Sequence, residues 1–211
     1  MSPAPHPSRA AVGVAIRQLG HDVVGHFADD DVLDRLAAAL VEFSAEISPG
    51  SPRSRDNVGF HDHWDAEIAE GAPVHNWDDR PFSGECSPWS VEPDVRREGV
   101  GVRGTVTFHS AHEGAPGRCH GGIVAGLFDD VLGSVLSVLG EGAFTGELTI
   151  RYDAPVPLHR ELVMRCWLDR RDGRKLYING ELTDGDQLVS SARSVFIQPR
   201  EAMSQSTFEP Q

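Results

Sequence analysis

Hydrophobic and polar positions divide the chain into a polar N-terminal part and a more regular C-terminal part. Beyond residue 100, five segments alternate apolar and polar residues as half-buried strands do, and a long apolar segment lies between the first two. One helix followed by an antiparallel meander predicts an α+β layer in which the sheet curls around the helix. The expected strands are residues 100–109, 144–152, 161–170, 175–183 and 187–198.

The central helix is expected over residues 120–139, which begin with His-Gly-Gly. Ideal helical geometry places four of its residues on one stripe, namely Gly122, Gly126, Asp129 and Gly133. A glycine stripe usually marks close packing against another backbone. The opening His-Gly-Gly also presents unhindered N–H groups that suit a carbonyl oxygen acquiring negative charge. Because the helix is otherwise almost wholly apolar, we expect Asp129 or its neighbour Asp130 at a covered interface.

The N-terminal part predicts two shorter helices, at residues 10–19 and 31–46, the second with aspartates at its positive end. Residues 55–89 show no convincing periodicity, and we interpret them as an ordered loop that covers another part of the molecule. We expect the 31–46 helix to pack on the sheet or on a partner subunit, and the loop to form part of a lid or pocket wall. The chain thus divides into an N-terminal helical and loop extension (1–80), one domain (81–200) and a tail (201–211).

The charge composition of the chain argues against two classes of binding partner. The chain has 32 acidic and 19 basic residues, a formal net charge of −13, so phosphate backbones and anionic membrane surfaces would repel it. We therefore expect neither a nucleic acid nor a membrane as partner. The N-terminus lacks an apolar run of signal-peptide length, and eighteen consecutive apolar residues occur nowhere, which favours a cytoplasmic location.

Cysteine and histidine usage argues against a metal site. The three cysteines are widely spaced and form no CxxC pair, which predicts reduced thiols and neither a disulfide framework nor a structural zinc site. His61, Asp62 and His63 could ligate a metal, but the sequence offers no further ligands for them. We expect no bound metal.

Two other motifs are rejected. Gly99, Gly101 and Gly104 match the dinucleotide-binding pattern GxGxxG, yet the following TVTF predicts a strand instead of the helix that such a site requires. Cys119 precedes His120, but adjacent side chains rarely face each other and no third orienting group is evident. A GxSxG elbow, the signature of α/β serine hydrolases, is absent from the sequence.

Several segments together carry a family resemblance. They are HGG at the start of a buried helix, an acidic residue at 129, GELTIRYDAPVP on the next strand, a last strand ending in VFIQP, and the upstream blocks PFSGECSPW and AHEGAPGRCHGG. Over roughly residues 81–200 the chain resembles hotdog-fold acyl-CoA thioesterases of the phenylacetate-degradation (PaaI-like) group. The resemblance implies a long helix wrapped by a curved antiparallel sheet. It also implies a homodimer paired edge to edge, with two active sites at the interface; a tetramer is the open alternative.

The resemblance also implies roles for residues of the central helix. The catalytic carboxylate would be Asp129, either as general base for a water molecule or as nucleophile, and Asp130 would be structural. The amide of Gly122 would polarise the thioester carbonyl, a role that the helix dipole supports independently. Gly121 would supply room for the substrate.

Other assignments keep more than one interpretation. His120 either orients the substrate, binds its carbonyl or caps the helix. Thr145 matches a threonine that in related proteins comes from the partner subunit and positions the water or carboxylate; otherwise it is an exposed strand residue. Arg151, Arg193 and Arg200 are candidates for pairing with CoA phosphates, or are ordinary solvated arginines. CoA enters as part of the substrate, and no separate cofactor is expected.

The function expected from the resemblance is hydrolysis of an acyl-CoA thioester to a free acid and CoA. The alternative is a non-catalytic hotdog protein that binds acyl-CoA or another acyl carrier. A hotdog dehydratase would need a differently placed Asp and His pair, which the sequence does not offer.

Overall fold

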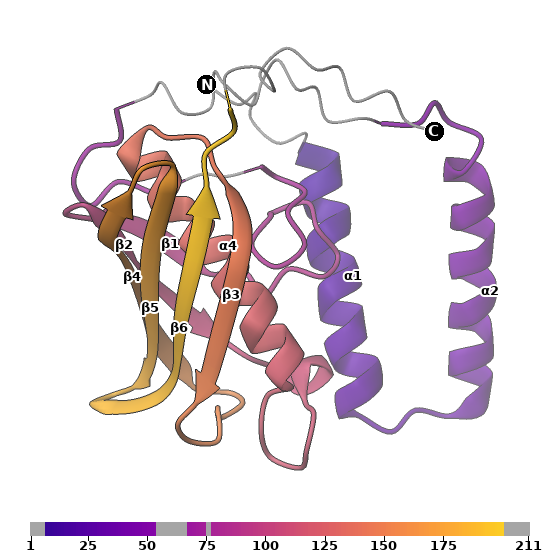
Figure 1. Ribbon diagram of the computed structural model, residues 1–211. Coiled ribbons are helices and arrows are strands. Elements are labelled where there is room, and N and C mark those ends of the chain that lie inside the picture. Colours follow the sequence, from indigo (N-terminus) through magenta and orange to yellow (C-terminus); the bar gives the residue numbers. More distant parts are fainter. Residues whose placement is uncertain (1–6, 54–66, 75–76, 201–211) are drawn as a thin grey trace.

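The computed structural model describes residues 7–53, 67–74 and 77–200 (Figure 1). Its helices are α1 (Pro7–Gly25), α2 (Asp30–Ile47), the short 3-10 helix η1 (Ser110–His112) and α4 (Gly121–Leu139). Its strands are β1 (Asp94–Glu98), β2 (Gly101–Thr107), β3 (Phe144–Tyr152), β4 (Glu161–Asp172), β5 (Lys175–Asp184) and β6 (Gln187–Ile197). The strands form one antiparallel sheet in the order β1-β2-β4-β5-β6-β3, and α4 lies against it. The expected α+β hotdog fold is confirmed.

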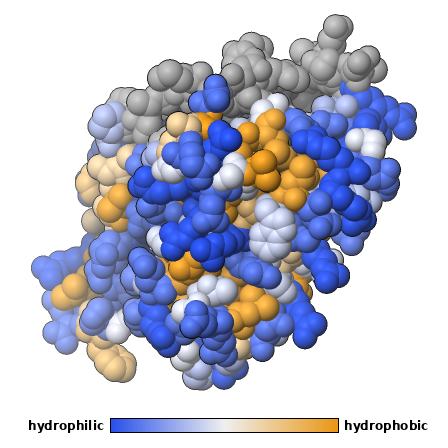
Figure 2. All heavy atoms as spheres, turned by 90° about the vertical axis from the view of Figure 1, so that its left-hand side faces the viewer, coloured by the Kyte–Doolittle hydropathy of each residue, from blue (hydrophilic) through white to orange (hydrophobic). Residues whose placement is uncertain are grey.

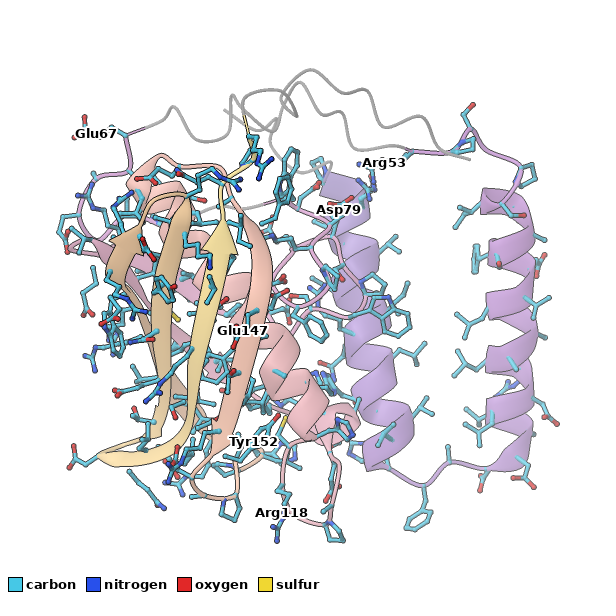
Figure 3. The ribbon with its side chains drawn as sticks, in the orientation of Figure 1. Arg53, Glu67, Asp79, Arg118, Glu147 and Tyr152 are labelled. Atoms are coloured by element: carbon cyan, nitrogen blue, oxygen red, sulfur yellow. The ribbon has the colours of Figure 1, made fainter. Side chains whose placement is uncertain are left out.

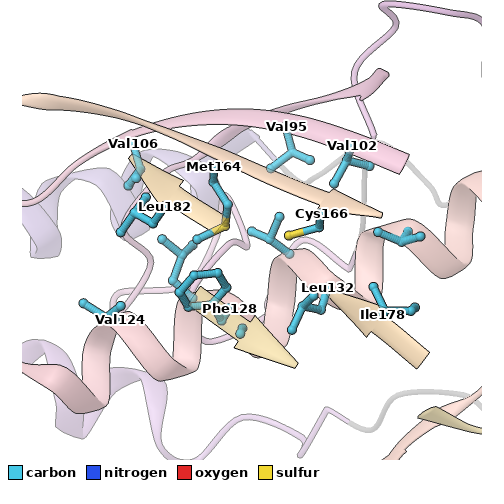
Figure 4. Close-up of a cluster of buried hydrophobic side chains, with 14 of the residues drawn as sticks. Val95, Val102, Val106, Val124, Phe128, Leu132, Met164, Cys166, Ile178 and Leu182 are labelled. Carbon is cyan, nitrogen blue, oxygen red and sulfur yellow. The ribbon is translucent and has the colours of Figure 1, made fainter. Parts of the chain in front are cut away.

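The core lies between α4 and the concave face of the sheet. Along β4, β5 and β6 buried and more exposed residues alternate, as expected for strands with one covered face. Phe128 and Leu132 of α4 are fully buried and meet Met164 of β4 and Ile178 of β5 (Figure 4). Burial of each such side chain contributes about 1.5–3 kcal/mol. By length and hydropathy α4 could cross a membrane, but most of it is buried inside this fold, as in any core helix.

The strand β1 was missed by sequence analysis. Its sequence, DVRRE, is polar because β1 is an edge strand, and only Val95 is buried. Gly99 adopts φ +60° in the turn that joins β1 to β2, and Gly101 leaves no space for a Cβ, which would lie 2.3 Å from the carbonyl oxygen of Cys166. The glycines of the rejected GxGxxG pattern therefore belong to a β-hairpin.

Helix α1 is longer than predicted and is attached firmly to the body. It was expected to end near Gly20, but it continues to Gly25 because packing against the body outweighs the poor helix propensity of glycine. At Gly13 an added Cβ would lie 2.9 Å from the carbonyl carbon of Cys86. The buried guanidinium of Arg17 donates to the carbonyls of Glu85 and Ser87 and pairs with Glu92.

A cluster of four histidines joins α1 to η1 and to the loop before β4. The ring centroid of His21 lies 4.7 Å from that of His112 and 5.1 Å from that of His109, and His159 lies 5.7 Å from His109. The backbone N–H of Ala111 donates to His21 Nδ1, and that of His109 donates to His112 Nδ1. Burial, reinforced by the neighbouring imidazoles, lowers the pKa of His112 to about 4 and also lowers those of His21 and His109.

This cluster predicts a loss of stability in mild acid. The folded chain keeps His112 neutral, whereas the unfolded chain binds protons below pH 6.5, so unfolding takes up protons. The free energy of unfolding should therefore fall as the pH drops from 6.5 towards 4, by on the order of 2 kcal/mol from His112. Urea denaturation at fixed ionic strength would measure this. His112→Asn keeps an acceptor and does not titrate, so its curve should be flatter; parallel curves for the two proteins would refute the prediction.

Helix α2 matches the prediction in extent but not in its packing on the sheet. It was expected at residues 31–46 and spans 30–47, with Asp30 and Asp31 in its first turn. No residue of α2 is buried, and the helix stands apart from the sheet (Figure 1). The alternative, packing on a partner subunit, is argued below.

Candidate active site

The N-terminus of α4 is capped by the histidine that precedes it. His120 has an extended backbone (φ −66°, ψ 130°), and its Nδ1 accepts from the N–H of Gly122 at 3.0 Å. Its carbonyl accepts from Ile123 and Val124. The capping role, one of three considered for His120, is therefore the one present, and the Gly122 N–H is not the free donor that the sequence suggested. Within the described residues, the N–H of Gly121 has no acceptor.

Tyr152 holds the same turn from the other side. At the end of β3 it lies near the loop that carries Arg118 and leads into α4 (Figure 3), and its hydroxyl donates to the Gly121 carbonyl at 2.6 Å. A Cβ at Gly121 would lie 3.0 Å from this hydroxyl, so the space at Gly121 is needed by Tyr152. Burial raises the pKa of Tyr152, which keeps the hydroxyl a donor. Sequence analysis missed this residue, although it ends the segment GELTIRY that carried the resemblance.

Asp129 and Thr145, two residues that the resemblance singled out, come together within one chain. The Thr145 hydroxyl donates to Asp129 Oδ1 at 2.9 Å, with Asp129 half-buried on α4 and Thr145 exposed on β3. The threonine belongs to the same chain here, whereas the resemblance implied one from a partner. Within the described residues the Asp129 carboxylate makes no other hydrogen bond. Its Oδ2 is therefore free to accept from a water molecule or approach a substrate.

The neighbouring Asp130 is occupied by structural contacts. Its buried Oδ2 accepts from the Phe82 N–H at 2.9 Å and from the Ser83 hydroxyl at 3.0 Å. Arg80 donates to the Asp130 carbonyl at 2.8 Å. These bonds fix residues 80–83 on α4 and match the structural role expected for Asp130.

The glycine stripe of α4 serves this packing at two positions. A Cβ at Gly126 would lie 2.3 Å from the Phe82 ring, and one at Gly133 would lie 2.9 Å from the Arg80 guanidinium. The described part of the predicted 55–89 loop, residues 67–74 and 77–89, thus includes a segment that covers α4. Residues 54–66 and 75–76 lie outside the described part.

The arginines considered for CoA binding do not converge on Asp129. Arg151 on β3 and Arg193 on β6 alternate with residues that face the core, so both lie on the outer face of the sheet, opposite α4. Arg151 pairs with Asp153 at 2.7 Å. Arg200 is exposed beyond the end of β6. Their role in binding phosphates stays a prediction.

The described structure bears on one of the two rejected chemistries, that of Cys119, and only in part on the metal site. Burial raises the pKa of the Cys119 thiol to about 12, which leaves almost no thiolate at neutral pH. Among the described residues there is no group of three or more His, Cys, Asp or Glu side chains placed to hold a metal ion. His61, Asp62 and His63 lie outside the described residues.

Comparison with known proteins adds independent information. Residues 116–191 match the family model described as the thioesterase superfamily. Acyl-coenzyme A thioesterase THEM5 of Homo sapiens is 36% identical over 88 residues, covering 41% of this chain and 36% of that protein. Acyl-coenzyme A thioesterase THEM4 of Bos taurus is 37% identical over 87 residues, covering 40% and 35%. The chain thus spans little more than a third of the length of these curated relatives.

A solved structure matches over a larger share of the chain. The crystal structure of protein RHA08564, a thioesterase superfamily protein, has a TM-score of 0.74 and 25% identity, and the match covers 90% of both chains. Residues 67–200 alone could not supply that share, so the match includes part of the N-terminal helices.

Proposed function

This chain belongs to the hotdog thioesterase superfamily, and from that premise we propose that it hydrolyses acyl-CoA thioesters to a free acid and CoA. The single observation that carries the proposal is the Asp129 carboxylate, half-buried on the core helix and oriented by the Thr145 hydroxyl at 2.9 Å. A carboxylate held in this way has one oxygen fixed and the other available for chemistry.

Two routes are open to Asp129. As general base it takes a proton from a water molecule while the water oxygen attacks the carbonyl carbon; the C–S bond then breaks and the CoA thiolate receives the proton. As nucleophile it attacks the carbonyl carbon directly, and the C–S bond breaks to release CoA as the thiolate; water then hydrolyses the resulting anhydride, which regenerates the Asp129 carboxylate and releases the proton that the thiolate takes up. Both routes give the same products and both develop negative charge on the carbonyl oxygen.

We assign the stabilisation of that charge to the first turn of α4. The Gly121 N–H has no acceptor among the described residues and lies at the positive end of the helix dipole. Tyr152 fixes the turn through the Gly121 carbonyl. The Gly122 amide, the donor expected from the sequence, could serve only after the His120 ring moves off it.

Spacing along α4 argues that each site combines two copies of the chain. Gly121 and Asp129 are eight residues apart, about 12 Å along the helix axis. For direct attack, the reacting atoms approach to about 3–3.5 Å while the donor lies about 3 Å from the oxygen. One chain's carboxylate therefore cannot attack a carbonyl held at its own Gly121. We propose that copies pair along the open edge of β3, so that the helix N-terminus of one copy approaches Asp129 of the second.

The proposal is tested by measuring thiol release from acyl-CoAs ranging from acetyl to palmitoyl, including phenylacetyl and benzoyl. We expect turnover of at least one member well above the uncatalysed rate. A folded protein that binds acyl-CoA in calorimetry but releases no thiol from any member would support the non-catalytic alternative. Failure to bind any member would reject both functions.

A further inference from the structure

Exposed hydrophobic side chains are concentrated on the two N-terminal helices. Of the sixteen large hydrophobic side chains exposed among the described residues, twelve lie between residues 12 and 47. They are Val12, Val14, Ile16, Val23, Val24, Phe27, Val32, Leu33, Leu40, Val41, Phe43 and Ile47. The face seen from the β1 and β2 side is by contrast covered mostly by hydrophilic residues, with apolar patches between them (Figure 2). We call residues 12–47 the arm. The apolar side chains that the arm exposes need an explanation.

The first helix of the arm has two faces with different roles. Gly13, Arg17 and His21 face the body, to which they attach α1. Val12 and Ile16 each precede one of these residues by one position, about 100° around the helix, and are exposed. Because α1 is fixed to the body, these side chains are held in place beside it.

The second helix carries an apolar stripe with the spacing of helix–helix interfaces. Its members follow one another at intervals of three or four residues, and they are Leu33, Leu36, Leu40, Phe43 and Ile47. Phe43 and Ile47 are 61% and 73% exposed, so the single chain does not cover the stripe. Its opposite face contains Asp31, Asp34 and Glu42. The helix is thus built to pack on something that the single chain does not supply.

The size of this surface suits a protein partner. A fully buried aliphatic side chain corresponds to about 100 Å² of apolar surface, so twelve side chains about half exposed amount to roughly 600 Å² per copy. A stable interface buries about 800 Å² on each partner. The apolar area that the arm exposes is therefore of the same order as the area that a stable dimer interface buries.

Charge and position favour a second copy of the chain as that partner. Arg35 is the only basic residue of α2, against five acidic ones, so an anionic membrane surface would repel the helix. The open β3 edge and the arm lie on the same side of the sheet (Figure 1). A copy paired at β3 would lie next to the arm, and the two-fold symmetry of a dimer would place its own arm reciprocally.

We propose that the arms of two copies pack on each other through these apolar stripes, so that each α2 is covered by the second copy. The arm then forms a second part of the dimer interface, in which helix–helix packing adds to the pairing of the β3 edges. The proposal concerns assembly and does not depend on the activity proposed above.

The test compares two matched pairs of substitutions in the full chain. Leu40→Glu with Phe43→Glu places two charges on the stripe, whereas Ala38→Glu with Ala45→Glu places the same charges on the opposite, exposed face. Mass is measured by analytical ultracentrifugation over a dilution series, and burial of α2 by amide hydrogen exchange. We expect the stripe pair to raise the dissociation constant of the dimer at least tenfold. If pairing of the β3 edges alone keeps the dimer together, the stripe pair should instead abolish the protection of the α2 amides from hydrogen exchange. The control pair should behave like the wild type.

A second measurement identifies the covering surface. A photoreactive benzoylphenylalanine replaces Phe43 in ¹⁵N-labelled chain, which is mixed with unlabelled wild type after dissociation and reassembly. Crosslinks from position 43 to unlabelled peptides of residues 7–53 are expected. The proposal would be overturned by any of three results: crosslinks solely within one chain, a wild-type protein that is monomeric at micromolar concentration, or equal behaviour of the two glutamate pairs. An α2 that exchanges its amides as fast as an uncovered helix would overturn it as well.

Discussion

Replacing Asp129 by asparagine is expected to lower kcat by about 100- to 10,000-fold on the best acyl-CoA, the range that general acid–base groups contribute. Asparagine keeps the shape of the side chain, and its carbonyl oxygen can still accept from the Thr145 hydroxyl. What is lost is the negative charge, which both the base route and the nucleophilic route require. Because Asp129 is only half-buried, the melting temperature should change little.

The neighbouring carboxylate supplies the matched control. Asp130→Asn leaves an oxygen in place for the Phe82 amide and the Ser83 hydroxyl, so activity should stay within a few-fold of the wild type. Thr145→Val removes only the hydroxyl that orients Asp129 and should give an intermediate loss. Steady-state kinetics of the three variants measures these effects. Equal losses in Asp129→Asn and Asp130→Asn would contradict the assignment of Asp129.

The central helix and five of the six strands could be predicted because their apolar residues recur at regular intervals along the sequence. Residues 120–139 are apolar almost throughout, and β4, β5 and β6 alternate, which are the patterns that packing against one core imposes. The strand β1 could not be predicted, since an edge strand with one buried side chain carries almost no hydrophobic pattern. The extent of α1 was missed for a related reason, because its contacts with Cys86 and Glu92 come from residues distant in sequence.

The candidate site was predictable to a similar degree. The family resemblance pointed to Asp129 and Thr145, and the structure brings the two within hydrogen-bonding distance; their catalytic roles stay a prediction. The Gly122 amide is occupied because the His120 side chain accepts its hydrogen bond. The Tyr152 contact depends on where β3 ends relative to the first turn of α4. Such contacts are set by tertiary packing, and the periodicity of the sequence carries no information about them.

Gly121→Pro is expected to lower kcat by on the order of 100-fold or more, because it removes one N–H from the position where negative charge develops. Proline fits the first position of a helix, and the extended backbone of His120 is the conformation favoured before proline. Gly121→Ala is the matched control: its Cβ meets the Tyr152 hydroxyl at the same 3.0 Å, yet the N–H is kept. Its loss should be much smaller. If Gly122 supplies the donor instead, the two Gly121 variants will have similar rates and Gly122→Pro will be the inactive one.

Mixing the two inactive variants tests whether each site combines two copies. In a mixed dimer of Asp129→Asn and Gly121→Pro, one site would contain both substitutions and the other neither, if carboxylate and donor come from different chains. Random assembly should then restore about a quarter of the wild-type rate, because half of the dimers are mixed and each has one intact site. If each site were built within one chain, both sites of the mixed dimer would contain one of the two substitutions and neither would be active. Co-expression with two affinity tags isolates the mixed dimer, and the absence of any restored activity in it would reject the shared site.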